Sequence, residues 1–177
     1  MSNLVLIAGQ STNYKPHPEG VVHAVCVDVI DLGEVESVFD GKSQKKPTVM
    51  LSFETESKRD DGKPFVVTRK FTASLHPIAR LAHFLGSWRG RSIVTGENLD
   101  LTKAIGQSGL LVIKHNVNEF GQAYAVIESI SKPNKRLAPS GHYDPTEARK
   151  RIEERKAGAR ATSKPSHGSD GQLAVEF

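Results

Sequence analysis

The sequence predicts a small antiparallel β-domain with one covering helix and a flexible basic tail. Five short segments with apolar residues at alternating positions are separated by turn-forming residues. A segment with helical spacing of apolar residues follows the third of them, and no strand–helix–strand alternation indicates a parallel sheet. The predicted fold class is therefore all-β, or β-rich α+β, with a barrel or a sandwich as its architecture.

The first strand is predicted over residues 20–32. Apolar side chains occur on both of its faces, which is typical of a central, buried strand. Residues 34–47 are predicted to be a connection, because they contain the turn dipeptide Asp40-Gly41 and a lysine cluster. The second strand follows over residues 48–56, and a polar hairpin loop leads from it to the third strand.

The third strand and the main helix are adjacent in the sequence. The strand is predicted over residues 65–75, where apolar and polar side chains alternate. His76-Pro77 ends that strand, and a proline fits the first turn of the helix that follows. Apolar residues recur at helical spacing until Gly86, which is predicted to end the helix.

Two further strands complete the domain. A short helix is predicted over residues 99–106, and strands are predicted over residues 108–117 and 122–131. The resulting order of three strands, one helix and two strands is that of an OB-fold. The sequence thus predicts a five-stranded antiparallel OB-like barrel over residues 20–132.

The segments on either side of this domain differ from it in composition. Residues 1–19 contain two prolines and several turn formers, which predicts an extended N-terminal arm. Residues 133–177 are rich in Lys, Arg, Ser, Gly and Ala, which predicts a flexible, largely disordered basic tail. Within this tail, Asp144 as a cap and Pro145 in the first turn predict a short helix over residues 145–158.

Charge is distributed unevenly along the chain. Residues 1–131 hold 14 Lys and Arg against 14 Asp and Glu, whereas residues 132–177 hold 10 against 6. The net charge of +4 therefore comes from the tail, and an anion-binding surface on the domain requires segregation of its charges. No apolar run reaches the roughly 20 residues of a membrane span, and no signal peptide is recognised, which predicts a cytoplasmic protein.

Catalytic and metal-binding signatures are absent from the sequence. The seven histidines lack metal-ligand spacing, and neither a phosphate-binding glycine loop nor a nucleophile motif occurs. The single cysteine, Cys26, lies in an apolar strand pattern and is interpreted as a small buried residue. The prediction is a protein that is not an enzyme and needs neither a metal nor a cofactor.

Basic and aromatic residues of the domain are the candidate functional residues. Single-stranded nucleic acid is held by cations on its phosphates and by aromatic faces on its bases, and the OB-fold is a common platform for both. The candidates for nucleic-acid binding are Lys42, Lys45, Lys46, Arg69, Lys70, Trp88, Arg89, Arg91, Lys114, Phe120 and Tyr124. Trp88 is either a stacking face or a packed anchor for the helix, and the three lysines of the first connection are either phosphate ligands or a solvated loop.

Four motifs carry a resemblance to a known family. They are Gly20–Gly33, Asp61–Phe65 with Lys70–His76, Leu85–Arg91 and Leu99–Gly106. Over residues 20–132 the chain resembles small phage- or prophage-encoded proteins regarded as OB-fold single-stranded-DNA-binding proteins. The resemblance implies non-catalytic binding of single-stranded DNA, without strong sequence preference, during phage replication or recombination in the host cytoplasm.

The same resemblance implies a docking role for the end of the chain. Proteins of this class often end in an acidic tail tipped by Phe, which docks replication or recombination enzymes. Phe177 beside Glu176 is similar to such a tip, although the tail before it is basic. Homo-oligomerisation stays open, as does the alternative of an adaptor: an OB-like protein-interaction module of a phage replication or particle complex that does not bind DNA. The neutral charge of the domain favours that alternative.

Overall fold

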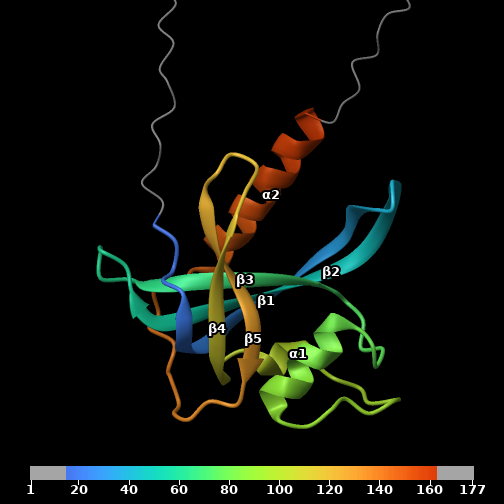
Figure 1. The fold of residues 1–177 in the computed structure, drawn as a ribbon. Helices are drawn as coiled ribbons and strands as arrows, with labels where there is room; N and C mark the ends of the chain where they lie inside the picture. The colour runs from blue at the N-terminus through green and yellow to red at the C-terminus, as the bar shows by residue number, and fades with distance from the viewer. Residues whose placement is uncertain (1–14, 163–177) are drawn as a thin grey trace, which may run out of the picture. The chain divides into compact units, whose positions relative to one another are not determined.

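A single antiparallel sheet forms the body of the protein in the computed structural model, which describes residues 15–162. Within this range the sheet has five strands in the order β3-β2-β1-β4-β5 (Figure 1). The strands are β1 (Gly20–Phe39), β2 (Lys42–Lys58), β3 (Pro64–Thr72), β4 (Ser108–Val117) and β5 (Ala123–Ser131). The remaining elements are α1 (Arg80–Arg89), the 3₁₀ helix η1 (Leu101–Ala104) and α2 (Pro145–Thr162). The predicted β-rich antiparallel class is confirmed.

The first two strands are much longer than predicted. Residues 34–47, expected to be a connection, continue β1 and β2 as a two-stranded ribbon that turns at Asp40-Gly41. Both turn residues have positive φ, 52° and 71°, which is the geometry of a type I′ hairpin. Register shifts after Cys26 and after Asp31 bend β1 before the ribbon begins.

Helix α1 packs its apolar face on the sheet through an aromatic cluster. The rings of Phe71 and Phe84 are 4.8 Å apart between centroids, and those of Phe53 and Trp88 are 5.3 Å apart. The helix does not end at Gly86 as predicted: it continues through Trp88 and ends before Gly90, which has a φ of 71°. The left-handed conformation that ends a helix occurs at Gly90 and not at Gly86, and the N–H of Gly90 donates to the Gly86 carbonyl. Gly90 therefore ends the helix.

The two edge strands β3 and β5 are joined by a side chain and not by a strand ladder. The Arg69 guanidinium donates hydrogen bonds to the backbone carbonyls of Ile127 at 2.8 Å and Glu128 at 2.9 Å. It also lies 4.9 Å from the ring centroid of Phe71. Because β3 and β5 do not pair in the sheet, the closed barrel expected from the sequence is not observed.

The described residues on the N-terminal side of β1, 15–19, pack against the sheet. His17 is buried, and its Nε2 lies 3.1 Å from the Thr55 hydroxyl. The His17 carbonyl in turn lies 2.6 Å from Nε2 of His115 on β4. Residues 15–19 of the predicted arm therefore belong to the folded body, and residues 1–14 lie outside the described residues.

Residues 133–143, predicted to belong to the flexible tail, form a strap over the outer face of β1 and β2. The backbone N–H and the hydroxyl of Ser140 donate to the Glu54 carboxylate, at 2.7 and 2.9 Å. The Tyr143 hydroxyl donates to the Asp28 carboxylate at 3.0 Å. Both carboxylates are buried, and these contacts make the strap part of the first compact unit, which ends at Tyr143.

The second unit begins at Asp144 and contains α2. As predicted, Asp144 caps the helix: its carboxylate accepts hydrogen bonds from the backbone N–H of Thr146 at 2.8 Å and of Glu147 at 3.2 Å. The predicted helix over residues 145–158 is present and extends to Thr162. No helix in the described range is both long enough and apolar enough to cross a membrane. Phe177 lies outside that range.

Replacing Arg69 should measure the strength of the β3–β5 junction. We expect Arg69→Ala to lower the free energy of unfolding by about 2–4 kcal/mol, because two carbonyls at a sheet edge lose their charged donor. Urea denaturation is the measurement. The neighbouring Lys70→Ala is the control and should stay within about 0.5 kcal/mol of the wild type, because Lys70 is exposed on the opposite face. An equal effect of both substitutions would contradict the role of Arg69.

Glu56 should make the stability dependent on acid pH. Its carboxylate lies 2.6 Å from Nζ of Lys135 on the strap and accepts from the N–H of His23, contacts that lower its pKa from 4.5 to about 2. Because the folded-state pKa is depressed, this stabilisation is complete above pH 4.5 and is lost as the pH falls toward 2. Glu56→Gln should therefore lower the melting temperature at pH 7, and the difference from the wild type should shrink through that window.

The same scan with Glu119→Gln provides the control, since Glu119 lies in the exposed β4–β5 turn and makes no ion pair among the described residues. A difference between wild type and Glu56→Gln that is constant from pH 7 to pH 2 would exclude the proposed electrostatic origin.

Candidate nucleic-acid interface

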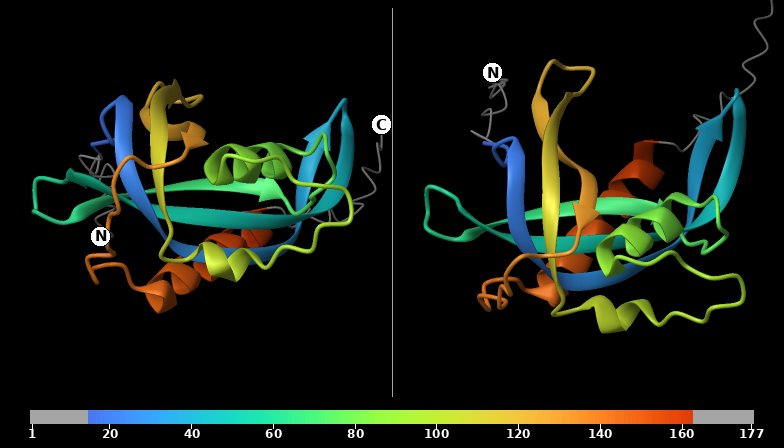
Figure 2. Two further views of the ribbon diagram at one scale, coloured as in Figure 1. Left: turned by 90° about the horizontal axis from the view of Figure 1, so that it is seen from below. Right: turned by 60° about the horizontal axis from the view of Figure 1, so that its bottom comes forward.

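Two hairpins of the sheet extend beyond the core, and each presents an exposed aromatic side chain. Their tips lie on the side of the molecule away from α1 (Figures 1 and 2). Phe120, in the turn between β4 and β5, is 79% exposed. Phe39, at the end of β1, is 71% exposed. Exposed rings of this size are suited to stacking on nucleic-acid bases.

The β4–β5 turn holds Phe120 in place through its backbone. The Asn118 side-chain oxygen accepts hydrogen bonds from the N–H of Phe120 at 3.0 Å and of Gln122 at 2.9 Å. Gly121 has a φ of 75°, which allows the tight turn that follows Phe120. Tyr124, on the adjoining strand, is 40% exposed. The predicted aromatic candidates Phe120 and Tyr124 thus lie on one hairpin.

The β1–β2 ribbon has two chemically different faces. Phe39 lies opposite Lys42, and Val35 lies opposite Lys46, so the alternation of side chains puts these four residues on one face. Ser37 and Gln44 complete this basic face, which carries no carboxylate on either strand. The other face has Glu36 opposite Lys45, and Glu36 also accepts a hydrogen bond from the Ser43 hydroxyl.

Phe39 was missed by the sequence analysis. It precedes the turn dipeptide Asp40-Gly41 and follows Val35 and Ser37 at alternating positions, which was the available signal for a strand. The mixed polar composition of residues 34–47 concealed it. Lys42, Lys45 and Lys46 therefore lie on a strand and not in a loop.

The predicted basic residues divide into those that are paired inside the protein and those that are not. Lys114 on β4 lies 2.6 Å from the Glu128 carboxylate, which raises the lysine's pKa. Arg69 is bound to the edge of β5. In contrast, Lys42, Lys45, Lys46 and Lys70 make no ion pair with any residue in the described part of the chain, so their ammonium groups are available to a ligand.

Arg89 and Arg91 are tied to the loop that follows α1. Nη2 of Arg89 lies 2.6 Å from the Glu97 carboxylate, and Nη2 of Arg91 lies 3.8 Å from the same group. The hydrogen bond from Arg89 is the main cause of the lowered Glu97 pKa. Arg89 therefore fastens the loop to the helix, whereas the Arg91 side chain stays 69% exposed.

Trp88 is a packed anchor and does not present a stacking face. It is only 7% exposed, and its indole N–H donates to the Ser108 carbonyl at 2.7 Å. The indole also lies against Phe53 and Phe84 in the core. Of the two interpretations that the sequence left open for Trp88, the structure favours packing.

The outer face of β1 and β2 is closed to a phosphate chain. The strap covers it, and the buried carboxylates of Asp28 and Glu54 lie beneath. The outward side chains of β3, which include Val66, Thr68 and Lys70, are exposed. The open part of the sheet is therefore β3 and the two hairpins.

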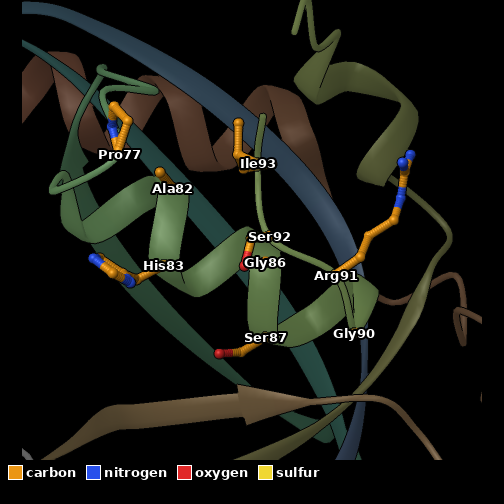
Figure 3. A pocket seen from close by; sticks show the side chains of 9 residues that line it. All are labelled: Pro77, Ala82, His83, Gly86, Ser87, Gly90, Arg91, Ser92 and Ile93. Carbon is orange, nitrogen blue, oxygen red and sulfur yellow. The ribbon is translucent and has the colours of Figure 1, made fainter. Parts of the chain in front are cut away.

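A cavity of about 500 Å³ lies between α1 and the segment that follows it (Figure 3). Its lining includes Pro77, His83, Ser87, Arg91 and Ile93 but no Phe, Tyr or Trp. The cavity therefore lacks the aromatic surface on which a base would stack.

Neither a reactive thiol nor a metal cluster is found in the described part of the chain. Burial is the main cause that raises the pKa of the Cys26 thiol to about 12, so that it stays protonated at neutral pH. No group of three or more His, Cys, Asp or Glu residues among the described ones could hold a metal ion.

Comparison of the chain with models of protein families, with curated proteins and with solved structures gives no match. The resemblance to phage single-stranded-DNA-binding proteins therefore stays a prediction from the four sequence motifs. The exposed side chains of the two hairpins and of β3 are the part of the structure that could contact a ligand.

Substituting Trp88 should separate packing from ligand binding. Trp88→Phe is expected to lower the free energy of unfolding by about 1–3 kcal/mol, because the Ser108 carbonyl loses its buried donor. The affinity for oligo-dT should stay within about twofold of the wild type. Urea denaturation and fluorescence anisotropy are the measurements. A variant that keeps its stability and loses oligo-dT affinity would show that Trp88 is a stacking residue after all.

Proposed function

We propose that the protein binds single-stranded DNA without catalysis, as an OB-like module acting in phage or prophage replication or recombination. The observation that carries this proposal is the exposure of Phe120 and Phe39 on the β4–β5 and β1–β2 hairpins. In OB-folds the loops between these strand pairs, together with the face of the second and third strands, bind oligonucleotides.

The connectivity of the sheet supports an OB-like barrel. Helix α1 lies in the chain between β3 and β4, and β1 pairs with both β2 and β4. The strands β3 and β5, which adjoin in an OB barrel, are bridged by Arg69. We infer a barrel that is completed by a guanidinium group at one junction.

Binding would combine stacking with neutralisation of phosphates. Bases would stack on Phe120 and Tyr124, and phosphates would approach the unpaired Lys70 on β3. The affinity should fall as salt rises, because the phosphates release counterions when lysines neutralise them. Arg69, Arg89 and Lys114 are not included, since their charges already have internal partners.

An adaptor that captures a protein partner is the alternative. It is favoured by the equal numbers of acidic and basic residues over residues 1–131. It is also favoured by exposed apolar side chains beside the aromatic ones, Val38 at 74% and Val117 at 65%. Such an adaptor would show no affinity for oligo-dT.

Anisotropy of labelled oligo-dT should distinguish the two functions. We expect binding by the full chain, with a log–log salt slope of about −0.7 for each phosphate neutralised. Phe120→Ala should weaken binding about 5- to 100-fold, which corresponds to one lost stacking contact. Ile78→Ala is the matched control, because Ile78 is 80% exposed and lies in the connection between β3 and α1, outside both hairpins. No binding at low salt would refute the DNA proposal and favour the adaptor.

A chain that ends at Tyr143 would locate the site. It keeps the strap and therefore the whole first compact unit. Retained affinity would support a site on the sheet, whereas loss of affinity would move the site to the second unit.

A further inference from the structure

The β1–β2 ribbon is a separate projecting element with two free edges. β3 pairs with β2 only from Thr48 onward, and β4 pairs with β1 only up to Val25. From Val35 to Lys46 the two strands thus have each other as their only strand partners among the described residues, whereas the Pro47 carbonyl already accepts from the N–H of Ala73. A two-stranded ribbon of this kind has the dimensions that the major groove of B-DNA admits.

The basic face of the ribbon carries groups that can read a groove. Ser37 and Gln44 lie opposite each other and offer hydrogen-bond donors and acceptors to base edges. Lys42 and Lys46 flank them on the same face and make no ion pair with a described residue. Exposed aromatic rings bind single strands by stacking on unpaired bases. Ser, Gln and Lys side chains instead form hydrogen bonds with the base edges and phosphates of a duplex whose bases stay paired.

The opposite face would be turned away from DNA. Glu36 lies there opposite Lys45, and Glu34, two residues earlier in the same strand, lies on the same face. Carboxylates repel phosphates, so the two faces differ in the sign of their interaction with a duplex. The ribbon therefore has one orientation in which it can approach a groove.

We propose that this ribbon places its basic face in the major groove of duplex DNA, so that the protein engages a junction between single-stranded and double-stranded DNA. The inference rests on the proposed function, because the single strand is assigned to the β4–β5 hairpin and β3. The ribbon adds a second class of ligand, the duplex beside that strand.

Three DNA probes test the proposal on the full chain: a dT single strand, a blunt duplex, and the duplex with the same dT tail. We expect the tailed duplex to bind at least about tenfold more tightly than the tail alone. Lys46→Ala should reduce this ratio several-fold. Lys45→Ala is the matched control, because it removes the same charge from the adjacent residue on the other face. Phe120→Ala should weaken both affinities and leave the ratio unchanged.

The outcomes separate the two proposals. Tight binding of the tail with a ratio near one would overturn the duplex inference and leave single-strand binding in place. Equal effects of Lys46→Ala and Lys45→Ala would also overturn it. Binding of the blunt duplex without binding of the tail would support the ribbon and refute the single-strand proposal. All these substitutions are at exposed or half-exposed positions, and melting temperatures confirm that each variant is folded.

Discussion

The structure depends on one charged side chain that joins the two edges of the sheet. Arg69 points to the inner face of β3 with Val67 and Phe71 and reaches the carbonyls of β5. Burial lowers its pKa, yet a guanidinium stays protonated in proteins. Two carbonyl acceptors and the rings of Phe71 and Phe84, at 4.9 and 5.4 Å, offset the cost of its desolvation. This junction lies beside the aromatic cluster on which α1 packs.

Structural use of charge restricts where a ligand can bind. Arg69, Arg89 and Lys114 each have an internal partner, and two buried carboxylates lie under the strap. Lys42, Lys46 and Lys70, which make no ion pair with a described residue, lie on the ribbon and on β3, parts of the sheet that the strap does not cover. Residues 1–131, whose charges cancel, can therefore present a local cationic surface such as the basic face of the ribbon, because their carboxylates lie elsewhere.

Local sequence patterns predicted the elements well and their tertiary roles poorly. The strand over residues 108–117 has the predicted bounds, because its apolar alternation and its flanking turns agree. Two long-range contacts escaped prediction: Arg69 meets a partner 58 residues away, and Ser140 meets Glu54 at a separation of 86. The composition of the strap, residues 133–143, predicts disorder because it contains few apolar residues. Its hydrogen bonds to the buried carboxylates of Glu54 and Asp28 nevertheless order it. Trp88 could be placed only once α1 was seen to continue past Gly86, because the sequence alone does not show which face of a helix is covered.

The contact of Arg69 with β5 also changes what this edge of the sheet offers to a further strand. Unpaired strand edges recruit strands from other copies, and the backbone carbonyls are half of what such a strand would bind. On β5, the carbonyls of Ile127 and Glu128 are already occupied by a bulky cation from the same chain. An incoming strand would have to displace the Arg69 guanidinium before its own N–H groups could reach these two carbonyls. In a closed barrel, hydrogen bonds between the two edge strands would prevent such pairing. In this open sheet, Arg69 occupies part of the β5 edge instead.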